Sequence, residues 1–228
     1  MYWEEKENTD KLNVVPDDVV DLVFNISCRA LPVDHAYALS QAIQSELSWF
    51  ADEPRAAMQT IHVAESGNGW FRPDGPDQLL YPSRRTKLTL RLPKHRVDDA
   101  AGLIGKTLQV DDNTLTITKL TQRSLNATST LFSRYIVLDQ GLSEMQFLEA
   151  ALIEFKAMNV HPRKMLCGKE TVILTPLGPL RPRSLMLADL KFEESIVLQH
   201  RGLGSHGAMG CGIFLPHKDI NEIGETMG

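Results

Sequence analysis

The stretch RGLGSHGAMGCGIF, from Arg201 to Phe214, holds five glycines within eleven residues. Glycine leaves backbone amides uncovered and lets another group come close to the chain, and successive amides in tight turns form anion-binding nests. A dinucleotide site or a P-loop is excluded, because those loops follow a strand and precede a helix, whereas this loop precedes an expected final strand and lacks a Gly-Lys-Ser/Thr ending. The stretch predicts a phosphate cradle, and a plain flexible loop is the alternative. The expected backbone contacts are Gly202, Gly204, Gly207, Gly210 and Gly212.

The elements before and after this loop follow a regular order. A strand is expected over residues 131–138, and Ser143 with Gln146 forms a capping box at the start of a helix. Further strands are expected at residues 164–167, 170–174, 184–190 and 212–216, with a short helix at 193–200. We interpret this order as a βαββαβ unit, which is the order of a ferredoxin-like domain.

The first half of the chain has the same order. Apolar residues alternate from Val20 to Cys28, which is the period of a strand with one buried face. Pro32 and Asp34 supply start signals for a helix whose apolar stripe extends to Phe50. Later elements are strands at 59–63 and 86–92, a long polar loop at 65–82, a short helix at 96–104 and a hairpin at 108–120.

The two halves together predict an α+β protein with two tandem ferredoxin-like domains. The expected domains are residues 1–122 and 123–228, and the second contains the Gly-rich loop. Each is expected to hold a four-stranded antiparallel sheet backed by helices. The halves share the order of their elements and no residue-level identity, so the repetition is one of architecture.

The net charge of -5 conceals an uneven distribution. The first 21 residues are acidic, whereas residues 78–97 contain no acid and six Lys and Arg side chains. A second basic run extends from Arg163 to Arg183. Local basic stripes set the field that a polyanion meets, so the pattern favours a nucleic-acid partner, and solvated strand faces are the alternative. No apolar run approaches the ~18 residues of a membrane helix, and no secretory signal is recognisable. We therefore expect a cytoplasmic protein with no membrane contact.

Four short stretches accompany the tandem domains: LPVDHA at 31–36, ESGNGW at 65–70, SRRT at 83–86 and GCGIFLPHK at 210–218. Over roughly residues 15–218 the chain resembles the Cas6 family, the CRISPR repeat endoribonucleases of the RAMP superfamily. The resemblance implies that the partner is CRISPR repeat RNA or crRNA, with other Cas proteins of an effector complex as further partners. It also implies cleavage without metal or other cofactor, in which the ribose 2′-hydroxyl attacks the adjacent phosphate and leaves a 2′,3′-cyclic phosphate and a 5′-hydroxyl.

Such a reaction needs a base, an acid and cations around the crowded phosphorane. Histidine suits the proton transfers because its pKa of ~6.5 lies near working pH. His35 is the first candidate, because family members often carry the catalytic histidine at the start of the first helix, where amides and the helix dipole favour phosphate. His62, which precedes the polar loop, is the second, and a structural histidine at a helix edge is the alternative for His35. Arg85 is expected to neutralise the scissile phosphate. The other expected RNA contacts are Arg84, Lys87, Arg91, Arg181, Arg183, Arg201 and Lys218.

Two other functions fit parts of the pattern. A non-catalytic RAMP subunit that only holds crRNA would have the same fold and the same Gly-rich loop. A general RNA-binding domain would expose aromatic side chains on its strands, and the strand pattern predicts none. Trp70 and Tyr81 are candidates for stacking on unpaired bases, and core packing is the alternative for Trp70. Tyr135 is expected in the core or on a sheet face.

Overall fold

The structure is a computed structural model that describes residues 15–63, 75, 78–139 and 141–217. The first domain is built on a five-stranded antiparallel sheet with the strand order β3-β5-β1-β7-β6. Two helices and one 3-10 turn accompany it, together with a small separate pair, β2–β4. The elements are β1 (Val19–Cys28), β2 (Leu31–Pro32), α1 (Ala36–Glu46), β3 (Ala57–Gln59), β4 (Leu79–Leu80), β5 (Lys87–Pro93), η1 (Lys94–Arg96), α2 (Val97–Ala101), β6 (Thr107–Val110) and β7 (Asn113–Ser124).

Alternation along β1 explains why this sheet forms. Leu22 and Phe24 are fully buried on one face and share a core with Leu39 and Ile43 of α1. Burying a side chain of this size stabilises the fold by roughly 1.5–3 kcal/mol. The order β3-β5-β1-β7 is the ferredoxin-like order, which confirms the predicted fold. The prediction of four strands in this sheet is wrong, because β6 pairs only with its hairpin partner β7 and adds a fifth strand.

The second domain contains a four-stranded antiparallel sheet with the order β11-β8-β10-β9. Its helix α3 starts with the predicted capping box, in which Ser143 and Gln146 exchange side-chain and backbone hydrogen bonds. The strand expected at residues 170–174 is wrong, because β9 ends at Glu170 and Ile173 makes only an isolated bridge to Leu180. The elements are β8 (Leu131–Ile136), α3 (Glu144–Ala157), β9 (Lys164–Glu170), β10 (Arg183–Ala188), α4 (Phe192–Arg201), η2 (Gly207–Met209) and β11 (Leu215–Pro216).

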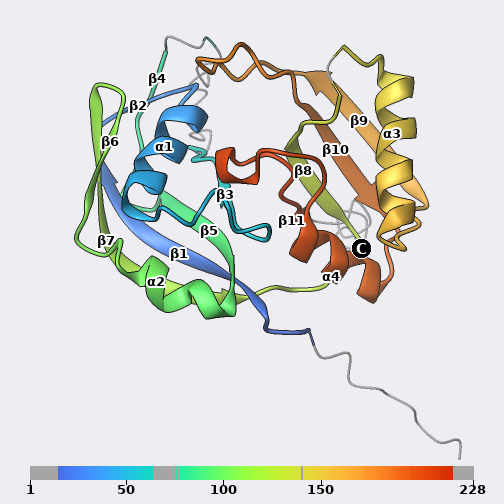
Figure 1. Cartoon of the computed structure of the whole chain (residues 1–228), viewed down its shortest axis with the longest axis horizontal. Coiled ribbons are helices and arrows are strands. Elements are labelled where there is room, and N and C mark those ends of the chain that lie inside the picture. Colours follow the sequence, from blue (N-terminus) through green and yellow to red (C-terminus); the bar gives the residue numbers. More distant parts are fainter. Residues whose placement is uncertain (1–14, 64–74, 76–77, 140, 218–228) are drawn as a thin grey trace, which may run out of the picture.

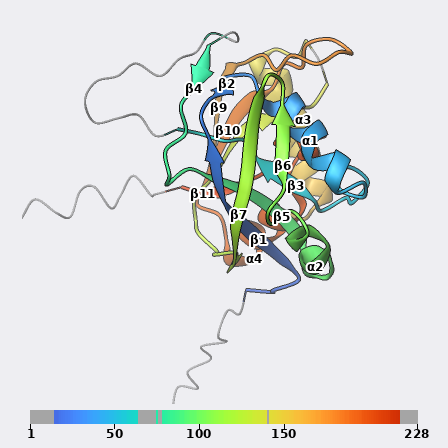
Figure 2. The same cartoon turned by 90° about the vertical axis from the view of Figure 1, so that its left-hand side faces the viewer.

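The two domains lie side by side, with the red Gly-rich loop between them (Figure 1). The connection between β9 and β10 crosses over to the first domain, where Ile173 and Leu180 join its hydrophobic core. The Leu174 amide donates a hydrogen bond of 2.7 Å to Asp34 Oδ2 at the start of α1. Figure 2 shows the β6–β7 hairpin in front of the second domain. The chain passes between the two sheets over six residues, since β7 ends at Ser124 and β8 begins at Leu131.

Candidate functional site

The Gly-rich loop connects α4 to β11 and folds onto the protein's own backbone. Gly204 and Gly212 have positive φ values of 78° and 75°. A Cβ atom at Gly204 would lie 2.2 Å from the Val137 carbonyl oxygen, and one at Gly212 would lie 2.3 Å from that of Leu203. These glycines are required by intramolecular packing. The prediction that their lack of a side chain makes room for a phosphate is therefore corrected at these two positions.

The loop also joins the two domains. The Gly212 amide donates a hydrogen bond of 2.6 Å to the Tyr135 carbonyl oxygen in β8. The Ser205 amide donates one of 3.2 Å to the Val137 carbonyl oxygen, directly after β8. On the other side, Gly210 packs on β3, where an added Cβ atom would lie 3.2 Å from the Met58 carbonyl oxygen. A Cβ atom added at Gly207 would likewise lie 3.1 Å from the Ala56 carbonyl oxygen. The loop thus bridges the edge strand of the first sheet and the central part of the second domain.

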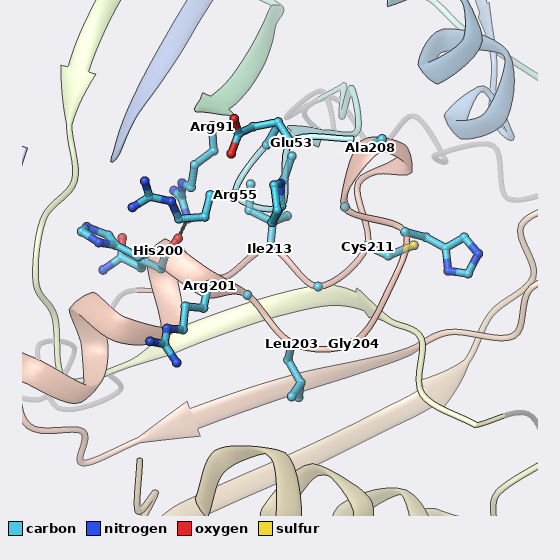
Figure 3. Close-up of a pocket in the computed structure, with 18 of the residues that line it drawn as sticks. Glu53, Arg55, Arg91, His200, Arg201, Leu203, Gly204, Ala208, Cys211 and Ile213 are labelled. Atoms are coloured by element: carbon cyan, nitrogen blue, oxygen red, sulfur yellow. Dashed lines mark hydrogen bonds between the residues drawn. The ribbon is translucent and has the colours of Figure 1, made fainter. Parts of the chain in front are cut away.

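A pocket of about 190 Å³ opens between this loop and residues 51–57. Figure 3 shows Arg55, Arg91, His200 and Arg201 on one side of the pocket and Cys211 on the other. The exposed Arg201 on this side matches the charge of an RNA phosphate, and the Glu53 carboxylate also lines the pocket. Arg55 was not predicted from the sequence, because it lies outside both basic runs and only the fold brings it beside the loop.

Arg91 is a correction to the predicted RNA contacts. Its residue is 2% exposed, and its guanidinium Nε and Nη2 donate to the two carboxylate oxygens of Asp21 at 2.8 and 2.9 Å. Nη1 donates to the carbonyl oxygens of Phe214 at 2.7 Å and Gln199 at 3.1 Å. The planar donor fork of arginine is suited to such a site. Arg91 holds β5 of the first domain against α4 and the end of the Gly-rich loop in the second.

The other two basic groups of the pocket lie nearer the solvent. Arg201 is exposed, and Arg55 pairs with Asp18 at 2.8 Å while its side chain stays 40% exposed. Burial lowers the pKa of His200, although the nearby Asp18 carboxylate opposes this shift. His200 is therefore neutral at neutral pH. Arg201 therefore remains as an exposed positive charge in the lining of the pocket, whereas the charge of Arg55 is shared with Asp18.

His35, the first predicted catalytic group, is only 3% exposed and forms the N-cap of α1. Its Nε2 accepts a hydrogen bond of 3.0 Å from the Ile61 amide, and its Nδ1 lies 2.9 Å from the Pro32 carbonyl oxygen. These partners require the neutral ring with the proton on Nδ1. The ring therefore ties the start of α1 to the segment that follows β3, and its role in proton transfer stays a prediction.

Asp34 does not cap the helix as expected, since it accepts from Leu174 instead. Burial raises the pKa of its carboxyl group, and the Leu174 hydrogen bond acts in the opposite direction. Asp34 therefore serves the contact between the two domains.

His62 lies in the segment that leaves β3 beside the Gly-rich loop. Its ring is partly exposed, and its Nε2 lies 2.9 Å from the Thr60 Oγ1. Thr60 itself packs on the loop, because an added Cβ at Gly210 would lie 2.7 Å from its methyl group. His62 follows directly after Ile61, the residue that bonds to His35. The two predicted histidines are thus brought to one corner of the first domain.

The predicted basic contacts before β5 lie at the same end of the sheet. Because β3 and β5 are antiparallel, with Gln59 opposite Thr89, the segment toward His62 leaves the sheet where Arg84 and Arg85 enter it. Both arginines are exposed. The Lys87 ammonium donates to Asn25 Oδ1 at 2.6 Å, so it is held on the sheet.

The remaining predicted contacts lie in the second domain. Arg181 and Arg183 both pair with Glu170, at 3.0 and 3.8 Å, and only the Arg181 side chain is largely exposed. Lys218, Trp70 and the stretch 65–70 lie outside the described residues. Within the described part of the chain, no three His, Cys, Asp or Glu side chains gather as a metal site would require. Over the same residues, no helix has the length and apolar character needed to cross a bilayer.

Comparison with known proteins identifies the family. The family model described as "Cas6 Crispr" matches residues 20–219. The chain belongs to the Cas6 family. A relative from Myxococcus xanthus (strain DK1622), named CRISPR-associated endonuclease Cas6, is 27% identical over 197 residues, which is 86% of this chain and 81% of the relative.

Solved structures share the fold of this Cas6-family chain. The product of a Cas6-related gene from Pyrococcus furiosus has a TM-score of 0.61 at 13% identity, covering 86% of this chain and 98% of that one. A RAMP protein described as binding different RNA substrates has a TM-score of 0.60, also at 13% identity and with the same two coverages. At these identities the likeness extends to the arrangement of the two ferredoxin-like domains and not to individual site residues.

Proposed function

We propose that this Cas6-family protein is an endoribonuclease that binds CRISPR repeat RNA and cuts it, without metal, to give crRNA. Membership of the family and the name of the Myxococcus relative support the activity. One observation carries the proposal. The hydrogen bond from the Ile61 amide to His35 brings His35 near the next residue, His62, and both lie beside the Gly-rich loop and its pocket.

We assign the two proton transfers to His35 and His62. One imidazole takes the proton from the 2′-hydroxyl while that oxygen forms a bond to phosphorus. The bond from phosphorus to the 5′-oxygen breaks, and this oxygen takes a proton from the second imidazole. Arg85 offsets the charge of the phosphorane. In the substrate-free geometry the His35 Nε2 faces the Ile61 amide, so RNA has to displace this contact before His35 can exchange a proton.

The test is single-turnover cleavage of the repeat RNA in EDTA, with mapping of the cut and of both new ends. His35→Gln keeps an oxygen that accepts from the Ile61 amide but removes the titratable group. We expect it and His62→Gln each to slow cleavage by roughly 10²–10⁴ with little change in affinity. The control is His161→Gln, an exposed histidine that lies elsewhere, in the second domain.

Arg85→Ala should act differently, by weakening binding as well as slowing cleavage. Loss of one phosphate contact should reduce the salt dependence of binding by a slope of about 1. If wild type cuts only when Mg²⁺ or Mn²⁺ is added, the metal-free mechanism is wrong. If wild type binds the repeat and never cuts it, the protein is a non-catalytic RAMP subunit. If His35→Gln melts earlier and its remaining folded fraction cuts at the normal rate, His35 has only a structural role.

A further inference from the structure

A row of apolar side chains crosses the second sheet from one edge to the other. The strand register places Leu215 opposite Phe132, Phe132 opposite Met186, and Met186 opposite Leu166. Residues directly opposite one another point to the same face of an antiparallel sheet. The four side chains therefore form one continuous strip across β11, β8, β10 and β9.

This strip lies on the face that α3 and α4 do not cover. The core that these helices share with the sheet contains Leu131, Leu185 and Leu187, the neighbours of the strip residues along the strands. Because side chains alternate between the faces, the strip points the other way. Leu166 is 68% exposed, and the other three strip residues are partly exposed. Phe132 is a partly exposed strand aromatic that the alternation pattern did not predict.

The basic side chains of Arg134 and Lys164 and the ring of His217 border the strip. The Arg134 guanidinium lies 5.9 Å from the centre of the Phe132 ring, and the His217 ring lies 6.0 Å from it in an edge-on arrangement. Lys164, two residues before Leu166 on the same face, pairs with Asp189 at 3.0 Å and stays 72% exposed. Aromatic rings beside cations are the combination that binds single-stranded RNA, since bases stack on the rings and phosphates meet the charges.

The strip also lies near the Gly-rich loop along β8. The Tyr135 carbonyl oxygen on β8 accepts the 2.6 Å hydrogen bond from Gly212 of the Gly-rich loop. Tyr135 lies three residues beyond Phe132, a distance of about 10 Å along a strand. A strand of RNA held at the loop can therefore reach the strip without leaving the protein.

We propose that this strip is a stacking platform for unpaired bases of the RNA strand that continues from the cleavage site. The proposal rests on the proposed function, which supplies the RNA. The cationic border favours RNA over an apolar protein partner. Phe132 provides the ring on which a base stacks, while Met186 and Leu166 extend the apolar surface on one side of it and Leu215 extends it on the other.

The test compares affinity for two fluorescent RNAs, the single-stranded flank of the repeat and a fully paired duplex of equal length. We expect Phe132→Ala to weaken binding of the single strand by roughly 5- to 150-fold, the effect of removing one base-stacking aromatic, and to leave duplex binding unchanged. Leu166→Glu adds a negative charge at an exposed position without disturbing the core, and should also weaken single-strand binding. Its matched control is Met145→Glu on α3, which is 72% exposed on the helical side of the sheet.

The outcomes separate this proposal from the proposed function. If wild type cuts repeat RNA while both platform variants bind the single strand as wild type does, the platform is wrong and the nuclease stands. If wild type neither binds nor cuts any repeat RNA, the proposed function itself has failed. If the variants change only the oligomeric state seen by light scattering, the strip is a protein interface, and the platform is refuted.

Discussion

Replacement of Arg91 by methionine should weaken the contact between the two domains, and it should lower stability more than a substitution at the surface does. The Arg91 side chain is 3% exposed and that of its partner Asp21 is 17% exposed. Methionine fills a similar volume but donates no hydrogen bond. Arg91→Met therefore leaves the Asp21 carboxylate without its cation and two carbonyl oxygens of the second domain, those of Gln199 and Phe214, without their donor.

The expected cost follows from these lost partners. Breaking a buried ion pair on one side typically costs about 3–5 kcal/mol, because the remaining charge is left uncompensated. For a protein of this size, each kcal/mol lowers Tm by roughly 2–4 °C, so we expect a decrease of roughly 6–20 °C. The matched control is Arg123→Met, since Arg123 faces Asp21 from the other neighbouring strand but is exposed. Because even an exposed ion pair contributes only about 0–1 kcal/mol, the loss of this exposed charge should cost no more than that.

Thermal unfolding measures both variants, and Asp21→Asn completes a double-mutant cycle with Arg91→Met. The Asp21→Asn change should cost much less in the Arg91→Met background than in wild type. RNA affinity should fall with Arg91→Met, because the loop and β3 no longer keep a fixed relation. A loss of stability no larger than that of Arg123→Met would refute the role of Arg91 in holding the two domains together, whatever happens to RNA binding.

Three further predictions concern the loop, the cysteines and the capping box. Gly204→Val should lower stability in thermal unfolding by more than Gly105→Val does. Both glycines have positive φ, but only a Cβ atom at Gly204 would meet a carbonyl oxygen, at 2.2 Å. Equal losses would leave backbone strain as the only cause. Burial raises the pKa of Cys211 to about 12, so it carries no thiolate at pH 8, and iodoacetamide followed by mass spectrometry should label it only after unfolding. Ser143→Ala should cost about 1 kcal/mol in denaturant unfolding, and no change would mean that the cap of α3 is not needed.

Local sequence patterns were sufficient to predict most of the fold. Alternation along β1 and the capping box at Ser143 depend only on neighbours in the chain, and both are present as predicted. The errors lie where tertiary contacts decide. Residues 170–174 have strand-like composition, yet Ile173 is drawn away from the sheet into the core of the first domain. No pattern within the second half of the chain could show that its partner is in the first half.

The candidate site was predictable in part for the same reason. The Gly-rich loop and the two histidines were recognised by residue type and position, but Arg91 was read as one cation of an exposed stripe. Arg91 lies on a strand with both faces buried at this point. Helices cover one face, and the second domain covers the face on which Arg91 lies. Charge in a sequence does not reveal whether its partner is a phosphate or a carboxylate. In the structure the partner of Arg91 is a carboxylate, that of Asp21, which lies seventy residues earlier in the sequence.

The glycines of the loop show how one local signal supports two different conclusions. A glycine at positive φ with no room for a Cβ atom indicates that some backbone group lies close by. At Gly204 and Gly212 that group is a carbonyl oxygen of the protein itself. Their tight packing fixes the exit of α4, where Arg201 lies, and the start of the strand that pairs with Phe132. For the proposed function, the loop would therefore act chiefly as a rigid support, with the pocket at one end and the proposed stacking platform at the other.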